Sequence, residues 1–456
     1  MKFHFSSVNL WCNKNLVDAE HMLWLVLSKY WQKWFDINFY QNPLDEEVEY
    51  ILLNTCGFLS TAREEAEHIM RYYDDLWKKI ILTWCYVQVA DSEFLSTLKN
   101  LYRIIPFLDY NSFLELIWFP AFNVKKIENL KDQKLNKYLK EVDEKQKWNQ
   151  AFSWKSDDIR AYLNAPLWYE YLKIAEWCDN SCTFCIIPRI RWKQKSKTIE
   201  DIEIEAKALI DAWVRDIILI AQDTTAYWTD IYWLPKLVDL LERLNEIEWD
   251  FTLRCLYMYP DNLNEEILKR LSRLNRFIPY FDIPFQHISE PILKRMWRYY
   301  DNNWIENILS SIRSNFKSPF IRTSFIIWFP WESDIDFNLL YDFVKSNEFD
   351  WVSLFEYHDE KLAASSKLDK KVDQKTSFSR INKLSKLLNE IAIRKKLSDK
   401  WKRFKWYIED VRWNNILIRR EIFSPEIDNL DKVKKSDLDI KGEIAIWDFV
   451  KYIFRW

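Results

Sequence analysis

From about Tyr171 to Tyr357 the chain alternates strand-like and helix-like segments, and this repeat constrains its fold more than any other feature. The apolar runs YLKIAE, DIILIAQD, DFTLRCLY, IPYFDIP, RTSFIIW and WVSLFEY are typical of buried strands. Amphipathic stretches such as IEDIEIEAKALIDAW and DFNLLYDFVKS separate them. Because repeated strand–helix units form parallel sheets, about six such units predict an open or partial (β/α) barrel. Active sites of such barrels lie on the loops that follow the strands.

The segments on either side of this repeat predict further domains. Residues 1–120 contain the strand-like runs KFHFSSVNL, VEYILLNT and KKIILTW and the helical run TAREEAEHIMRYY, which together predict an α/β domain. Residues 121–165 are polar and charged, and we interpret them as a linker. The barrel core is expected over 166–398. Residues 399–456 are strand-rich and predict a small C-terminal β-barrel.

The strongest local signal for chemistry is a C-x3-C-x2-C loop formed by Cys178, Cys182 and Cys185, directly after the strand-like YLKIAE. Three thiolates within eight residues can converge on one metal centre. A structural zinc site uses four ligands, and the five histidines are all far away in the sequence. Three ligands on a four-iron cluster would leave one iron open for catalysis. A zinc site completed from a distance and a set of buried thiols remain the alternatives.

A second set of cysteines is dispersed over the N-terminal region. Cys56 and Cys85 lie at the ends of predicted strands, and Cys12 follows the first strand-like run. Each alone reads best as a buried structural cysteine. Since all three follow predicted strands, they are expected at one edge of the same sheet, which favours a second cluster site. Cys255 lies within a strand-like run and is expected in the core.

The composition contains one anomaly, a shortage of glycine matched by an excess of tryptophan. The chain has 2 Gly and 26 Trp, whereas average usage of about 7% would give roughly 32 Gly. Trp also stands in turn-like contexts such as FPWES at Trp331 and IRWK at Trp192. Such positions often need a backbone conformation that an indole side chain disfavours. We therefore expect a gene in which UGA codons encode glycine but are read here as tryptophan, while a truly Trp-rich protein is the alternative.

Charge and cysteine usage restrict the compartment and the partners. The 66 Lys and Arg residues are balanced by 69 Asp and Glu residues, for a net charge of -3, which argues against a protein built mainly to hold phosphate backbones. Seven cysteines without an export signal indicate a reducing compartment, so a cytoplasmic location is expected. No apolar run approaches the length of a membrane span, so no membrane association is expected.

Several motifs resemble a known family once glycine is written for tryptophan. Restoring glycine at seven such positions gives GCNKNLVDAEHMLGL, TGC, AEGCDNSCTFCIIP, RGK and FIIGFPGES; the positions are Trp11, Trp24, Trp84, Trp177, Trp192, Trp328 and Trp331. These segments resemble the methylthiotransferase family of radical S-adenosylmethionine (SAM) enzymes over almost the whole chain. NLVDAE, NTCGF, LIAQDTTAYW and RREIFSPEIDNL resemble its RimO group in particular.

The resemblance implies both a fold and a mechanism. It implies an N-terminal methylthiotransferase domain, a radical SAM partial barrel and a C-terminal TRAM barrel. Cys178, Cys182 and Cys185 would hold the four-iron cluster whose open iron binds SAM and cleaves it to a 5′-deoxyadenosyl radical. Cys12, Cys56 and Cys85 would hold a second four-iron cluster that delivers a methylated sulfur. The cofactors carry this chemistry because no acid or base in the chain can activate an unreactive C–H bond.

Further residues are expected near SAM through the same resemblance. Gln286 and Glu332, in IPFQH and FPWES, are the candidate cofactor-binding residues. His287 and Arg298 are weaker candidates of the same kind. As isolated residues, all four read equally well as capping or structural polar groups.

The resemblance also implies a substrate, an aspartate of small-subunit ribosomal protein twelve, presented alone or on the ribosome, and a flavodoxin-like electron donor. The alternative within the family is an N6-isopentenyladenosine of transfer RNA. From 401 to 456 we count 12 Lys and Arg against 10 Asp and Glu, which is weakly basic for a domain that grips phosphates. If the tryptophans are genuine, a non-enzymatic metal-binding module associated with RNA or the ribosome becomes the alternative of another class.

Overall fold

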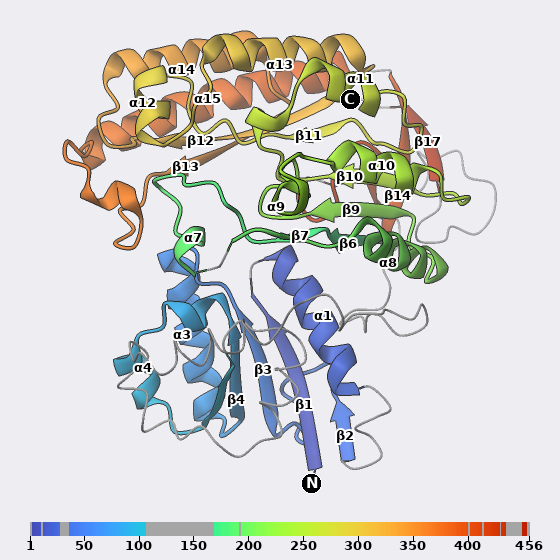
Figure 1. Cartoon of the computed structure of the whole chain (residues 1–456), viewed down its shortest axis with the longest axis vertical. Coiled ribbons are helices and arrows are strands. Elements are labelled where there is room, and N and C mark those ends of the chain that lie inside the picture. The colour runs from blue at the N-terminus through green and yellow to red at the C-terminus, as the bar shows by residue number, and fades with distance from the viewer. Residues whose placement is uncertain are drawn as a thin grey trace. The chain divides into compact units, whose positions relative to one another are not determined.

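The computed structural model describes most of the chain, which divides into two compact units (Figure 1). The N-terminal unit comprises Met1–Pro166, Ile186–Lys193 and Glu200–Ala208, and the C-terminal unit comprises the remainder. The described residues are 2–10, 12–27, 36–105, 168–190, 193–399, 402–412, 415–428, 430–434 and 449–453. The predicted linker at 121–165 and Trp11 and Trp192 lie outside them.

A five-stranded, fully parallel sheet forms the centre of the N-terminal unit, in the order β2-β1-β3-β4-β5. Its strands are β1 (Lys2–Asn9), β2 (Asp36–Phe39), β3 (Tyr50–Thr55), β4 (Lys79–Trp84) and β5 (Leu101–Ile105). β3 and β4 are buried along almost their whole length, as expected for central strands of a parallel sheet. The three predicted strands KFHFSSVNL, VEYILLNT and KKIILTW therefore correspond to β1, β3 and β4.

Helices connect these parallel strands. They are α1 (Asn13–Leu27), α3 (Ser60–Asp75) and α4 (Ser92–Thr97), with a short 3-10 turn at Cys85–Gln88. Helix α3 is strongly amphipathic and buries Ala66 and Met70 against Ile51 and Leu82 of the sheet. This apolar cluster packs the sheet against α3. Because the strands are parallel, the loops that follow them lie at one edge of the sheet.

The C-terminal unit contains six parallel strands in two sheets of three, with the orders β10-β9-β6 and β11-β12-β13. They are β6 (Tyr169–Lys173), β9 (Asp216–Ile220), β10 (Thr252–Cys255), β11 (Tyr280–Asp282), β12 (Phe320–Ile327) and β13 (Trp351–Glu356). An isolated bridge between Leu253 and Phe277 links the two sheets beyond the named strands. The six predicted strands are all present, and they form the partial barrel that the repeat predicts.

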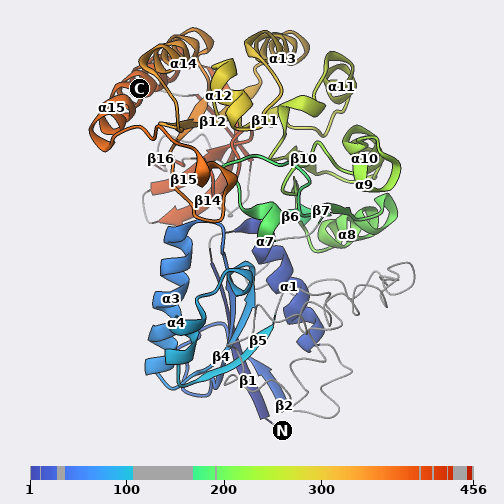
Figure 2. The ribbon, with the colours of Figure 1, turned by 60° about the vertical axis from the view of Figure 1, so that its left-hand side comes forward.

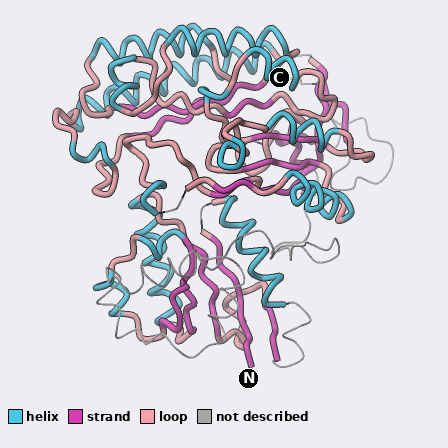
Figure 3. Tube along the Cα trace, in the orientation of Figure 1, coloured by secondary structure: helices cyan, strands magenta, loops and turns pink. Residues whose placement is uncertain are grey.

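Helices cover the outside of these strands, as Figures 2 and 3 show. They include α10 (Leu237–Asn245), α11 (Glu265–Leu271), α12 (Glu290–Arg295), α13 (Asn302–Asn315), α14 (Asp334–Asn347) and α15 (Gln374–Ser398). Shorter elements of this unit are α9 (Thr229–Tyr232), Pro260–Asn262, Ala364–Lys367 and the two-residue strands β7 (Ala175–Glu176) and β8 (Lys195–Ser196). Helix α7 (Ile187–Ile190) and most of α8 (Ile199–Asp211) belong to the N-terminal unit. Local sequence fixes several starts; Ser333 and Asp336, for example, form a capping box at α14.

The last strands form a four-stranded antiparallel sheet in the order β16-β15-β14-β17. Its members are β14 (Arg403–Arg412), β15 (Asn415–Arg420), β16 (Asp431–Lys434) and β17 (Phe449–Ile453). Arg254 of β10 ties this segment to the barrel, because its guanidinium donates to Asp216 at 2.8 Å and to the Ile422 carbonyl at 2.7 Å. The predicted α/β class with a parallel barrel and a C-terminal β-region is confirmed, whereas the exact domain boundaries and the TRAM assignment stay predictions.

None of the helices in the described part of the chain is both long and apolar enough to cross a bilayer.

Candidate cofactor-binding site

The C-x3-C-x2-C loop leaves the barrel directly after β6 and β7, at the carboxyl end of the first parallel strand. Cys182 is buried, and Cys178 and Cys185 are partly buried. The Asn180 amide donates to the Cys178 sulfur at 3.4 Å, and the Cys185 amide donates to the Cys182 carbonyl at 3.0 Å. Local hydrogen bonds thus hold the loop in a compact conformation. It lies at the carboxyl end of the barrel strands, where barrel enzymes bind their ligands.

A buried carboxylate, Asp223, anchors this loop to the neighbouring strand β9. One oxygen accepts the Asn180 side-chain amide at 2.7 Å. The other accepts the hydroxyl of Thr225 at 2.6 Å and the amides of Thr225 and Ala226 at 3.0 and 3.1 Å. Burial raises the pKa of Asp223, and burial followed by the charge of Asp223 raises the pKa of the Cys178 thiol to about 12. Asp223 lies within the LIAQDTTAYW motif, but the sequence alone does not distinguish its carboxylate from an ordinary turn residue.

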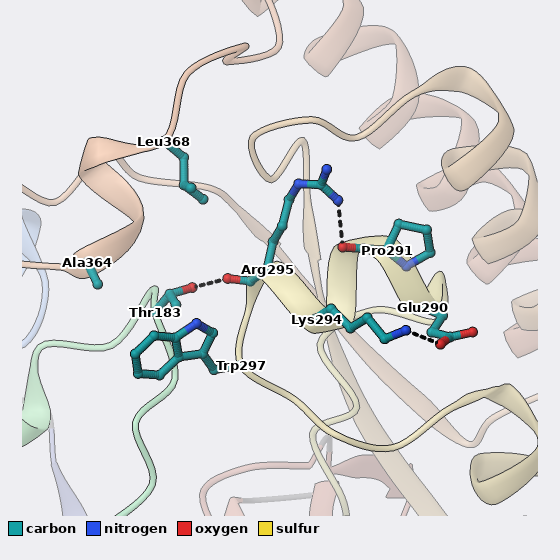
Figure 4. Close-up of a pocket in the computed structure, with 8 residues that line it drawn as sticks. All are labelled: Thr183, Glu290, Pro291, Lys294, Arg295, Trp297, Ala364 and Leu368. Atoms are coloured by element: carbon teal, nitrogen blue, oxygen red, sulfur yellow. Dashed lines mark hydrogen bonds and ion pairs between the residues drawn. The ribbon is translucent and has the colours of Figure 1, made fainter.

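Thr183 fastens the other side of the loop. Its hydroxyl donates to the Arg295 carbonyl at 2.7 Å and its amide to the Met296 carbonyl at 3.1 Å, while its own carbonyl accepts the Ser365 amide at 2.8 Å. A cavity of about 770 Å³ opens beside Thr183, with Lys294 and Arg295 on one wall and Leu368 on another (Figure 4). The cysteine loop is therefore held rigidly, yet lies beside a surface cavity.

The predicted SAM-proximal residues gather at the carboxyl ends of β11 and β12. Gln286 bridges to Phe325 of β12 with φ 68°, and His287 next to it is buried. Burial lowers the pKa of His287 to about 4, so its ring is neutral near pH 7, 3.8 Å from the Glu332 carboxylate. The structure thus brings Gln286, His287 and Glu332 together.

The carboxylate of Glu332 already accepts hydrogen bonds from neighbouring groups of the protein. Its carboxylate accepts the Trp328 amide at 2.5 Å and a bond from Arg380 of α15 at 2.7 Å. Burial raises the pKa of Glu332 to about 7, although Arg380 acts in the opposite direction. Burial outweighs the ion pair, because the Glu332 side chain is fully buried and pairs with one cation, Arg380. These contacts fix the turn after β12 and make Glu332 a support of that turn.

Arg298 lies deeper, near the cysteine loop. Its guanidinium donates to the Tyr300 hydroxyl at 3.1 Å and lies 4.1 Å from the centre of the Tyr259 ring. Tyr259, Tyr300 and Arg298 all interact electrostatically with Cys182. The two tyrosines were not foreseen from the sequence, since nothing in their local pattern distinguishes them from core aromatics.

In the N-terminal unit, the second set of cysteines follows three neighbouring strands. β3 pairs with β1 on one side and with β4 on the other, and Thr55 stands opposite Trp84 at their carboxyl ends. Cys56 and Cys85 are therefore the next residues on adjacent strands. A Cβ atom on Gly57 would lie 2.7 Å from the Cys85 carbonyl oxygen, which shows how closely the two loops pack.

Side-chain hydrogen bonds tie the first loop to the same edge. The Asn15 side-chain amide donates to the Thr55 carbonyl at 3.1 Å, and the Asn54 side-chain amide donates to the Asn15 carbonyl at 2.6 Å. Asn15 is three residues beyond Cys12, so the loop that carries Cys12 is fixed next to the end of β3. The expectation that the three cysteines share one sheet edge is met.

The donor sets fit iron–sulfur clusters chemically. Each set offers three thiols, the ligand type such clusters use, and leaves one position for another ligand. Within the described residues, no three Cys, His, Asp or Glu side chains converge as a ready metal site. The ligand assignments therefore stay predictions. Cys255 is fully buried in β10, as expected for a core residue.

Comparisons with known proteins identify the class. The family model of the Radical SAM superfamily matches residues 172–344. Among solved structures, the chain is similar to the radical SAM methyltransferase TsrM from Kitasatospora setae, with a TM-score of 0.51 and 10% identity over 78% of this chain and 75% of TsrM. That likeness shows the fold. The fold and the matched family define a radical SAM enzyme, a class that uses a 4Fe-4S cluster and SAM.

Sequence relatives identify the branch. The chain is 33% identical over 434 residues to "Ribosomal protein uS12 methylthiotransferase RimO" of Acetivibrio thermocellus, which covers 94% of this chain and 91% of that protein. It is 32% identical over 455 residues to the protein of the same name from Clostridioides difficile, covering 97% and 96%. The chain belongs to the RimO family of radical SAM methylthiotransferases, which confirms the resemblance drawn from its motifs.

Proposed function

We propose that this enzyme replaces a hydrogen on the β-carbon of an aspartate in ribosomal protein uS12 with a methylthio group. The observation that carries the proposal is the similarity to RimO proteins over almost the whole chain. The similarity extends over 94% and 97% of this chain for the two relatives. The reaction takes place in the cytoplasm, where the ribosome is made and used.

We assign the cluster that works with SAM to Cys178, Cys182 and Cys185. When bound, the cluster and SAM supply the radical that removes a hydrogen atom from an unactivated carbon, which no side chain of the chain can do. The chain's part is to hold and shield that site. Asp223 and Thr183 fix the loop on both sides, and Arg298 lies beside Cys182.

Gln286 and Glu332 belong to the SAM side of this site in our proposal. Gln286 presents its backbone in an unusual left-handed conformation at the carboxyl end of the barrel. Glu332 fixes the turn after β12 through Trp328 and Arg380. Such preorganised walls position a cofactor without touching the reacting atoms.

We assign a second four-iron cluster to Cys12, Cys56 and Cys85. Its support is the adjacency of β1, β3 and β4 and the packing of Gly57 against Cys85. This set has the same three-thiol composition as the first, and it can therefore also leave one iron for a sulfur ligand. In our proposal this cluster delivers the sulfur.

We propose that an acidic, flavodoxin-like protein delivers the electrons beside Thr183. The cavity there is lined by Thr183, the residue after Cys182. Lys294 and Arg295 on its wall outnumber the one acidic lining residue, Glu290, which pairs with Lys294. Charged walls of this kind accelerate and orient an oppositely charged partner.

The donor proposal is tested with Lys294→Glu, assayed with reduced flavodoxin and separately with dithionite. Lys269→Glu is the matched control, because Lys269 of α11 and Lys294 of α12 each pair with a glutamate one helical turn earlier. We expect a severalfold higher KM for flavodoxin in Lys294→Glu alone, with dithionite rates unchanged. Equal flavodoxin kinetics in both variants would remove the docking site from this surface.

The substrate is tested by mass spectrometry on uS12 and on transfer RNA after incubation with the enzyme, SAM, a sulfur source and a strong reductant. A methylthio group on the uS12 aspartate is the expected result. Methylthiolated N6-isopentenyladenosine with unmodified uS12 would place the enzyme in the sister branch of the family. The near-neutral charge of 401–456 favours the protein substrate, because phosphate binding relies on basic excess.

A further inference from the structure

Backbone geometry singles out a subset of the tryptophans. Fifteen residues other than glycine have positive φ in the described part of the chain, and nine of these fifteen are tryptophan. They are Trp77, Trp84, Trp177, Trp213, Trp228, Trp233, Trp297, Trp328 and Trp331. Positive φ is uncommon for residues with a Cβ atom and is ordinary for glycine. No property of the tryptophan side chain favours positive φ.

Three of the nine occupy the same position in the same helix-ending motif. After α3, the amide of Trp77 donates to the Asp74 carbonyl at 3.0 Å and the next amide, of Lys78, donates to the Tyr73 carbonyl at 3.0 Å. This pair of bonds is the Schellman motif, whose left-handed residue is usually glycine. Trp77 has φ 58° and takes that glycine position.

The same pair of bonds recurs after α8 and α12. Trp213 donates to the Ile210 carbonyl at 2.9 Å, with the Val214 amide bonded to the Leu209 carbonyl at 3.0 Å. Trp297 donates to the Lys294 carbonyl at 3.1 Å, and the following amide donates to the Leu293 carbonyl at 2.9 Å. Three helices of unrelated sequence thus end on tryptophan where helices ordinarily end on glycine.

Three of the nine side chains lie largely in solvent. Trp77, Trp213 and Trp233 are 75%, 74% and 90% exposed. Trp228 is buried, yet its indole N–H has no hydrogen-bond partner among the described residues. A buried donor without a partner costs stability, and exposed rings bury little surface, so these four side chains give no reason for tryptophan. Trp84 and Trp331 do have partners, because their indole N–H groups donate to Asp18 and Asp369 at 2.7 and 2.8 Å.

Two of the nine directly precede predicted cluster ligands. Trp84, before Cys85, has φ 76° and ψ -145°, close to a region that essentially only glycine occupies. Trp177, before Cys178, has φ 63°. Trp328 and Trp331 flank the turn that Glu332 holds. Tryptophans with positive φ therefore occur next to both cysteine sites and in the turn after β12 that Glu332 holds.

We propose that the natural protein carries glycine at these nine positions, encoded by UGA, and that glycine there is what lets both cysteine loops close around their clusters. Other tryptophans behave differently. Trp406 lies in β14 with its ring fully buried in the core of the C-terminal sheet, and Trp168 is buried and stacked on Tyr407 with ring centres 4.3 Å apart. These two have no positive φ, and their rings fill space that glycine would leave empty.

The coding DNA and the natural protein test the proposal directly. We expect UGA codons at the nine positions and glycine in the corresponding peptides of protein isolated from its own cells. UGG codons, or tryptophan in the peptides that span positions 77, 213 and 297, would overturn it. This test is independent of the proposed reaction, because it reads the residue and not the activity.

Stability and metal loading give a second test on the chain printed above. Trp213→Gly should raise the melting temperature by about 2–4 °C, because the left-handed strain disappears. Trp406→Gly, the matched control, should lower it through the cavity it creates. Iron uptake should be higher when both Trp84 and Trp177 are glycine than in the unaltered chain. A lower melting temperature for Trp213→Gly, or equal iron uptake, would contradict the proposal.

Discussion

The two cysteine sets reach similar donor chemistry by different routes. In the C-terminal unit, Cys178, Cys182 and Cys185 lie in one loop, and local hydrogen bonds hold it together. In the N-terminal unit, Cys12, Cys56 and Cys85 belong to three loops that only the pairing of β1, β3 and β4 brings to one edge. The first site depends on the conformation of one segment, and the second on the integrity of a whole sheet.

This difference gives the two sites different vulnerabilities. The compact loop relies on a few anchors, chiefly Asp223 and Thr183. The dispersed set relies on the shared hydrophobic core between the sheet and α3. Damage to an anchor should therefore disturb the compact cysteine set alone, whereas loosening the N-terminal core should separate Cys12, Cys56 and Cys85.

The largest expected effect comes from removing each set of ligands. Replacing Cys178, Cys182 and Cys185 with alanine should abolish SAM cleavage and remove about half of the iron. Replacing Cys12, Cys56 and Cys85 should also remove about half of the iron but leave cleavage to 5′-deoxyadenosine intact. Iron analysis and chromatography of the cleavage product measure both. Loss of cleavage in both variants would mean that the two sites do not act separately.

A smaller effect is expected from the anchor of the compact loop. Asp223→Ala leaves the buried amides of Thr225 and Ala226 and the Asn180 side chain without their acceptor, a loss of about 1–3 kcal/mol for each unsatisfied group. We expect Cys178 in the cluster-free protein to react faster with a thiol reagent. The matched change at the other site is Thr55→Val, which removes the bond from Thr55 to the Thr83 carbonyl.

That control should leave Cys178 untouched, because Thr55 belongs to the N-terminal sheet. Faster alkylation of Cys178 in both variants would show that the two sites are not independent. Unchanged alkylation in Asp223→Ala would show that the loop keeps its shape without this anchor.

The smallest expected effect is a pH dependence confined to the C-terminal unit. Glu332 has a pKa of about 7 when folded, above its ordinary value of 4.5, so the folded protein binds the extra proton between these values. Its contribution to stability is therefore present at low pH and is lost as the pH rises through 7, by about 3 kcal/mol. His287, with a lowered pKa of about 4, acts in the opposite direction and costs stability as the pH falls below 6.5.

The two groups nearly cancel in the unaltered protein. Glu332→Gln removes the first contribution, so we expect the unfolding free energy to rise more steeply with pH between about 4 and 6.5. Denaturant titrations across this range measure the slope. A slope equal to that of the unaltered protein would mean that Glu332 is already ionised in this range.

Much of the barrel could be predicted from sequence, because its buried parallel strands contain apolar runs such as IILI in β9 and FII in β12. The compact cysteine loop could also be predicted from the sequence, because its three cysteines are neighbours in the chain. The adjacency of β1, β3 and β4 was harder, because no local pattern says that β1 lies between β2 and β3.

Asp223 was missed for a similar reason. In the sequence, QDTT reads as an ordinary turn, and only the packed loop after β9 buries the carboxylate against Asn180. The place of Glu332 beside SAM stays a prediction. Its bond from Trp328 is local, four residues away, whereas its bond from Arg380 of α15 is a long-range consequence of the fold. The glycine shortage was visible at once, whereas the nine positions became distinct only through their φ angles.

The most direct measurement of the central claim, two separate cluster sites, is the metal content of the anaerobically reconstituted protein with glycine at the nine positions. We expect two four-iron clusters, about eight irons per chain, with brown colour and visible absorbance. Each alanine triple variant should retain about half of that iron. A colourless protein with one equivalent of zinc, the metal of closed four-ligand sites, would contradict the account.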